Sequence, residues 1–103
     1  MARLLRASCA LLWVALCMGL PACAGAPVQE MSNARQAIKA ARDAGAGEVA
    51  PQAMNEAQSL LERAEVSLQK RAYRDARRAA IAARGKASEA LDAAQLRDRD
   101  GTG

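Results

Sequence analysis

The sequence predicts an all-α protein, an up-down-up hairpin or bundle of three helices that follows an N-terminal signal peptide. Three observations predict it. Alanine dominates a chain that is 51% hydrophobic, only 2% aromatic and without Phe or His, and Ala, Leu, Arg, Glu and Gln are strong helix formers. Apolar residues recur at alternating spacings of three and four. Gly and Pro gather between the periodic stretches rather than inside them. With 103 residues, one small domain is the expected size.

The first helix is expected at about 28–44, where the apolar positions follow a 3-4-3 spacing: Met31, Ala34, Ile38 and Ala41. Gly45 and Gly47 follow it, and glycine commonly ends a helix because it adopts the left-handed backbone conformation easily. The stretch from 45 to 50 is therefore expected to be a linker.

The second helix is expected at about 51–70, because Pro51 suits the first helical position. Its apolar positions are Met54, Ala57, Leu61, Ala64 and Leu68. A single helix from 51 to 97 is the alternative, since no Gly or Pro lies near residues 71–72. A turn is preferred there, because the Leu68 stripe would drift and the Lys70–Arg71 pair suits a helix C-terminus.

The third helix is expected at about 73–97, with a stripe made almost wholly of alanine: Tyr73, Ala76, Ala80, Ala83, Ala87, Ala90 and Ala94. Gly85 interrupts this stretch at a cost of about 1 kcal/mol relative to alanine, which does not break the helix. The polar residues 98–103 are expected to form a disordered tail.

Residues 1–22 have the three parts of a secretory signal peptide. Arg3 and Arg6 make a positive first region, residues 7–20 make an uncharged apolar run of 14 residues, and the small residue Ala22 follows. A membrane-spanning helix needs about 20 apolar residues, so this run is short for a span.

The residues Leu20, Pro21, Ala22 and Cys23 (LPAC) resemble a bacterial lipobox. The resemblance implies cleavage between Ala22 and Cys23, a diacylglycerol on the Cys23 thiol, and an N-acyl group such as palmitate on its new N-terminus. Residues 23–27 would then form a tether. Because Ala24 is not the Asp associated with inner-membrane retention, the resemblance favours the outer membrane of a Gram-negative bacterium, with the domain facing the periplasm.

Two other outcomes stay open for this segment. Ala22, Cys23 and Ala24 form an A-x-A pattern, so ordinary cleavage after Ala24 would release a soluble periplasmic binding or adaptor protein. The leader would otherwise remain as an uncleaved anchor. Cys9 and Cys17 lie in the apolar run, so a chain beginning at Cys23 has no second cysteine with which to form an internal disulfide.

Residues 34–83, with Ala50–Pro51 before the second helix and the spacing of Tyr73 and Ala76, resemble a family of small helical domains of unknown function in bacterial envelope proteins. Those domains often occur in lipoproteins, sometimes ahead of an outer-membrane-protein-A-like peptidoglycan-binding domain. The second half also resembles one helix-turn-helix of a tetratricopeptide-like repeat. These resemblances imply a fold and a location, and no activity.

Basic residues gather around the expected second turn, where Asp75 is the single acidic residue between positions 70 and 86. A candidate patch for an anionic surface consists of Lys70, Arg71, Arg74, Arg77 and Arg78. Cations in the first turns of a helix oppose its macrodipole, and a local rule broken without compensation suggests function. The alternative is a solvated face with an Arg71–Asp75 pair at i,i+4.

Several function classes are disfavoured. Without histidine the chain lacks the commonest general base and transition-metal ligand, and its serines lack a histidine partner, so neither an enzyme nor a metal site is expected. Removing Arg3 and Arg6 with the leader leaves 13 basic against 11 acidic residues, a net charge of +2, which is too mild to indicate a nucleic-acid partner. No cofactor or small-molecule substrate is expected beyond the lipid on Cys23.

The expected partners are the membrane and either a second copy of the chain or another envelope protein. From Val28 onward there are only thirteen large apolar side chains, so the domain is marginal alone; a loosely packed hairpin is the alternative. A long coiled coil that resembles the major murein lipoprotein is a third possibility, but Gly45, Gly47 and Pro51 would interrupt it. The function expected is therefore that of a non-catalytic interaction or spacer domain on a lipid anchor.

Overall fold

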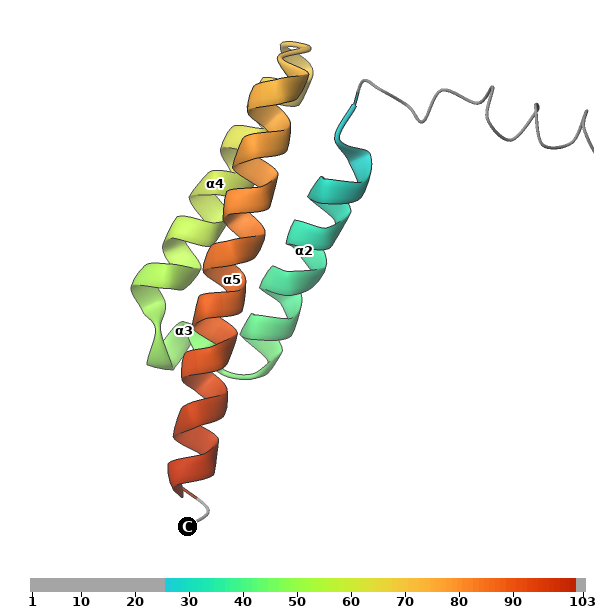
Figure 1. Cartoon of the computed structure of the whole chain (residues 1–103). Helices are drawn as coiled ribbons and strands as arrows, with labels where there is room; N and C mark the ends of the chain where they lie inside the picture. Colours follow the sequence, from blue (N-terminus) through green and yellow to red (C-terminus); the bar gives the residue numbers. More distant parts are fainter. Residues whose placement is uncertain (1–25, 102–103) are drawn as a thin grey trace, which may run out of the picture.

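The computed structural model describes residues 26–101, which form four helices and no strand. These are α2 (Val28–Asp43), the short α3 (Ala46–Val49), α4 (Pro51–Gln69) and α5 (Tyr73–Gly101). Helix α2 runs from one end of the bundle to the other, α4 returns, and α5 passes along both (Figure 1). The all-α, up-down-up fold class is confirmed.

The predicted bounds of the first two long helices and the start of the third lie within one residue of the observed ones. The alternative of one helix from 51 to 97 is wrong, because the chain turns at residues 70–72 between α4 and α5. The signal peptide at 1–22, the tether residues 23–25 and tail residues 102–103 lie outside the described residues.

Two predicted loops are helical in the structure. The linker contains α3, which forms because the buried Ala46 joins the core and the α3 backbone packs on α5. The expected disordered tail is wrong for residues 98–101, because α5 continues to Gly101. Near this end of α5, Arg97 forms an ion pair of 3.8 Å with Glu48 of α3, which links the last part of α5 to the rest of the bundle.

Gly45 makes the turn after α2. Its φ is +82°, a left-handed conformation that costs residues with a Cβ roughly 1–2 kcal/mol. Its amide donates a hydrogen bond of 3.0 Å to the carbonyl of Arg42, which satisfies one of the carbonyls left free at the helix end. Pro51 then occupies the first turn of α4 as predicted.

The core is built around a face of α5 that consists only of alanine. The buried residues of α5 are Ala76, Ala79, Ala80, Ala83, Ala87, Ala90 and Ala94. The larger buried side chains come from the two flanking helices, Met31 and Ile38 from α2 and Met54 and Leu61 from α4. Small residues on α5 let both neighbours approach closely, and their larger side chains fill the space between the helices.

This core is small. Fully burying a Met, Ile or Leu side chain contributes about 1.5–3 kcal/mol, and few such side chains are present, so the domain depends on close packing of its alanines. No polar or charged residue is buried among the described residues. No helix within residues 26–101 combines the length and apolar character needed to cross a bilayer.

We predict that Ala83→Leu lowers the free energy of unfolding by about 1–3 kcal/mol, because the added atoms overpack the contact of α5 with its neighbours. Ala83 is fully buried, whereas Ala82 beside it is exposed. Ala82→Leu is therefore the matched control and should change stability by less than about 0.5 kcal/mol. Chemical denaturation followed by circular dichroism measures both, and equal effects would contradict the packing described.

We also predict opposite effects at two glycines. Gly45→Ala should lower the free energy of unfolding by about 1 kcal/mol, because the backbone is left-handed there and a Cβ would lie 3.2 Å from Arg97 Nη2. Gly85→Ala should raise it by up to about 1 kcal/mol, since Gly85 lies within α5 and a Cβ there meets no atom within 4 Å. Thermal and chemical unfolding test both; a stabilising Gly45→Ala would show that the turn is wrongly described.

Candidate functional site

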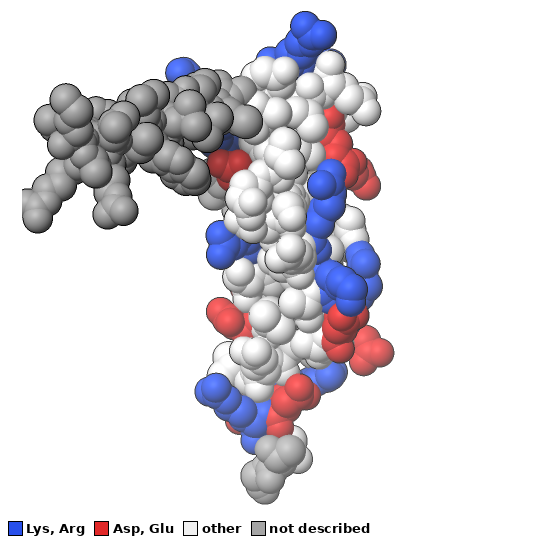
Figure 2. All heavy atoms as spheres, turned by 90° about the vertical axis from the view of Figure 1, so that its right-hand side faces the viewer, with Lys and Arg blue, Asp and Glu red and all other residues white. Residues whose placement is uncertain are grey.

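The turn between α4 and α5 gathers four exposed basic residues at one end of the bundle: Lys70, Arg71, Arg74 and Arg78. We call these four residues the basic end. Lys70 caps α4, Arg71 lies in the turn, and Arg74 and Arg78 lie in the first two turns of α5. Figure 2, viewed from the α2 side, shows basic side chains at this apex, with acidic and basic side chains intermixed along the rest of the face. None of the four forms an ion pair with another described residue within 4.0 Å.

The backbone of this turn is a Schellman motif with an arginine in the place that glycine usually takes. The amide of Ala72 donates a hydrogen bond of 2.9 Å to the carbonyl of Ser67, and the amide of Arg71 donates one of 3.0 Å to the carbonyl of Leu68. Arg71 has a φ of +60° and is the one non-glycine residue with positive φ among those described. In the turn after α2 the equivalent position is Gly45.

Arg77, the fifth residue of the predicted patch, is used differently. It is half-buried, and its Nε lies 3.2 Å from Glu30 Oε1 of α2. This ion pair joins the start of α2 to the start of α5 and places a carboxylate beside Arg77 near the N-terminus of α5.

One part of the solvated-face alternative, the Arg71–Asp75 ion pair, is wrong. Arg71 lies outside the helix, so the i,i+4 geometry does not apply, and no ion pair between the two forms within the described residues. Arg84 and Lys86, which continue the basic run in the sequence, lie farther along α5 and do not belong to the basic end.

The described chain begins at the same end of the bundle. Pro27 is buried and its carbonyl accepts a hydrogen bond from the amide of Met31. Met31 is itself buried in a small cluster with Ala64, Ala79 and Ala80, which lie near the end of α4 and the start of α5. Ala22 and Cys23, the predicted cleavage and lipidation residues, lie outside the described residues.

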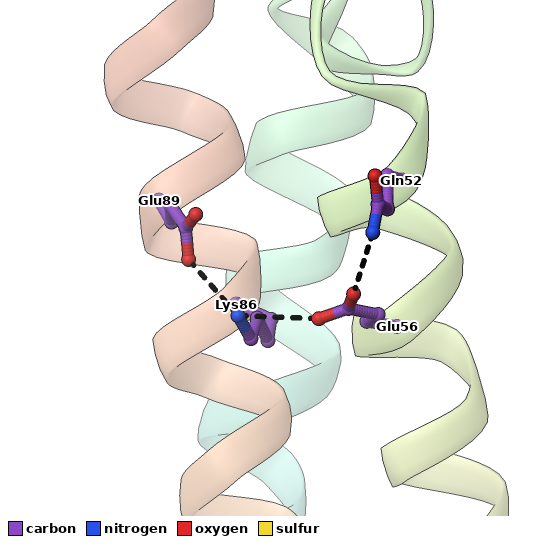
Figure 3. A network of polar contacts seen from close by, with 4 residues as sticks. All are labelled: Gln52, Glu56, Lys86 and Glu89. Carbon is purple, nitrogen blue, oxygen red and sulfur yellow. Dashed lines mark hydrogen bonds and ion pairs between the residues drawn. The ribbon is translucent and has the colours of Figure 1, made fainter.

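A second polar group joins the first turns of α4 to α5 (Figure 3). Lys86 Nζ lies 3.1 Å from Glu56 Oε2 and 3.3 Å from Glu89 Oε2, and Gln52 Nε2 donates a hydrogen bond of 3.4 Å to Glu56 Oε1. The hydrogen bond from Lys86 and its positive charge lower the pKa of Glu56. The hydrogen bonds to Glu56 and Glu89 raise the pKa of Lys86.

This group joins α4 to α5, and all of its charged members are paired and partly open to solvent. Sequence reasoning missed it, as it missed the pair of Arg77 with Glu30. These residues flank the apolar stripes of their helices, and charges at such positions commonly pair between helices. Their position beside the stripes could therefore have indicated both ion pairs. Among the described residues no group of three or more Cys, Asp or Glu side chains could hold a metal ion.

Two open hollows lie on the surface of the described residues. One of about 460 Å³ lies between α4 and α5, and its lining includes Arg63, Asp75 and Arg78. Another of about 590 Å³ is lined only by α4 residues from Pro51 to Arg63, and the face of one helix does not enclose a cavity. No buried polar side chain points into either groove.

A family model described as a domain of unknown function, DUF4398, matches residues 29–101. The chain belongs to this family. The match covers the helical domain from the start of α2 to the end of α5, and it agrees with the resemblance to a small domain of unknown function. No curated protein and no solved structure matches the chain.

For the DUF4398 domain we predict that Lys86→Met raises the pKa of Glu56 toward its ordinary value of 4.5. Because the pKa of Glu56 is lowered in the folded state, the interaction stabilises the fold above the unfolded pKa. That stabilisation is lost as the pH falls through the folded pKa. The Glu56 carboxyl carbon, titrated by NMR between pH 2 and 7, reports this pKa directly.

The control for this titration is Lys39→Met, which removes the separate Lys39–Asp43 pair within α2. It should leave the titration of Glu56 unchanged. An unaltered Glu56 pKa in Lys86→Met would show that the ion pair does not persist in solution.

Proposed function

We propose that the protein is a lipid-anchored protein of the cell envelope whose DUF4398 domain is a non-catalytic interaction or spacer module. The observation that carries this proposal is the LPAC sequence, in which Cys23 directly follows a positive region and an apolar run. Cys23 is three residues before Ala26, where the described domain begins. On this proposal the domain hangs from the periplasmic face of the outer membrane by a short tether.

The architecture suits a spacer or an interaction module. Helix α5 has 29 residues, which corresponds to a length of about 44 Å, and its C-terminal part extends past α2 and α4 (Figure 1). If the anchor is at the N-terminal end of the bundle, the far end of α5 points away from the membrane. That end, with the exposed Leu96, is where another envelope protein or a second copy would be met first.

A soluble periplasmic adaptor is the second candidate, and the A-x-A pattern of residues 22–24 favours it. The same helical domain would then act free of the membrane. The two candidates differ in the N-terminal residue of the mature chain and in the mass attached to it.

We predict that the protein purified from the membrane fraction of its own host begins at Cys23 and carries the mass of a diacylglycerol and an N-acyl chain. Intact-mass spectrometry and N-terminal peptide mapping measure both. Cys23→Ser should abolish the added mass. Cys17→Ala, which changes a cysteine of the apolar run, is the matched control and should leave processing intact. A chain beginning at Gly25 without added mass would refute the anchor and support the soluble adaptor.

A further inference from the structure

We propose that the basic end, formed by Lys70, Arg71, Arg74 and Arg78, docks on anionic phospholipid headgroups of the membrane that holds the anchor. This inference rests on the proposed function, since the lipid on Cys23 brings the membrane within reach. It assigns an orientation to the domain: the α4–α5 turn lies against the lipid and the far end of α5 points into the periplasm.

The geometry of the N-terminal end supports contact. Cys23 is three positions before Ala26, and an extended chain spans at most about 3.5 Å per residue, so the anchor lies within about 10 Å of Ala26. The Glu30–Arg77 ion pair holds the start of α2 beside α5. Tyr73, the first residue of α5, lies about 6 Å from Arg77 along the helix axis. The turn of residues 70–72 lies beyond Tyr73 in the same direction (Figure 1). The turn therefore protrudes past the point where the chain enters the bundle.

The charge at this end differs from the charge elsewhere on the domain. Along the body of the bundle most basic side chains pair with acidic ones: Arg35 with Glu65, Lys39 with Asp43, Lys86 with Glu56 and Glu89, and Arg97 with Glu48. Arg42, Arg63 and Arg84 are exposed and form no such pair with a described residue, but they are spread over three helices, whereas the basic end places four cations within nine consecutive residues. The four residues of the basic end form no such pair with a described residue and are exposed. Between positions 70 and 78 the single acidic residue is Asp75. A compact surface of unmatched cations is what an anionic bilayer attracts.

The backbone at Arg71 is a second, independent observation. The left-handed conformation of this residue favours glycine, and the corresponding turn of α2 has Gly45 in this position. An arginine at residue 71 therefore costs stability and leaves an exposed cationic side chain in the turn. Arg74 likewise lies in the first turn of α5, where positive charge is disfavoured. Folding alone would select other residues at these positions, whereas binding to headgroup phosphates accounts for them.

The experiment uses the lipidated protein as its host makes it, reconstituted in vesicles of phosphatidylcholine with or without phosphatidylglycerol. A fluorophore on Gln69→Cys, an exposed position beside the turn, reports its distance from the bilayer through quenching by a headgroup-labelled nitroxide lipid. A fluorophore on Gly47→Cys, at the opposite end, is the control. We expect quenching at position 69 to exceed that at position 47, to require phosphatidylglycerol, and to weaken with salt.

Arg71→Gly separates docking from folding. It should lower the ratio of docked to undocked molecules about fivefold, the effect of one cation at an anionic surface, while the Tm stays the same or rises because glycine suits the left-handed turn. Arg42→Gln removes one exposed charge at the opposite end and should leave docking unchanged. Neutralising Lys70, Arg74 and Arg78 to Gln together should abolish the phosphatidylglycerol dependence.

The outcomes separate the two proposals. If intact mass shows the anchor but quenching is equal at positions 69 and 47, or is indifferent to Arg71→Gly and to lipid charge, the headgroup inference is overturned and the anchor stands. If the chain carries no acyl mass, the proposed function fails and the inference fails with it. Quenching that depends on the basic end with phosphatidylcholine alone would also overturn it, because the partner would then not be the anionic lipid.

Discussion

Seven buried alanines along one face of α5 bring two other helices against it, since only methyl groups separate the backbones there. Everything else in the core follows from this close approach. The larger side chains must come from α2 and α4, because α5 leaves no room for its own, and Met31, Ile38, Met54 and Leu61 fill that role. The same arrangement limits the hydrophobic free energy available, because a buried methyl contributes little. Such a domain tolerates few changes of volume in its interior and few unsuitable residues in its turns.

Because the core supplies little hydrophobic free energy, the difference between the residues at the two turns is informative. The turn after α2 uses glycine in the left-handed position, and the turn after α4 uses Arg71. Both close their helices with the expected backbone hydrogen bonds, so geometry alone does not explain the difference. The arginine belongs to a group of four exposed cations at one end of the molecule, whereas several cations on the sides of the bundle, such as Arg35 and Lys86, pair with carboxylates of other helices.

The two ends of this DUF4398 domain differ. The described chain begins beside the basic turn at one end, and the last turns of α5 extend beyond the other helices at the opposite end. The proposed anchor and the proposed headgroup contact act at the same end, which would hold the domain upright with two points of attachment. No polar or charged residue is buried among the described residues, so their charged side chains all lie at the surface.

The sequence by itself determined the helices, because local propensity, the 3-4 spacing of apolar residues and the positions of Gly45 and Pro51 all act over a few residues. It also determined that basic residues flank one turn. Tertiary structure alone decided that α3 is helical and that α5 continues to Gly101, since packing of Ala46 and the pairing of Arg97 with Glu48 stabilise segments whose composition indicates a loop. Tertiary structure also decided which basic side chains form ion pairs. Arg77 and Lys86 pair with carboxylates of other helices, whereas the residues of the basic end form no such pair with a described residue. Those partners are far apart in the chain, so their contact depends on how the helices pack, which no local pattern specifies.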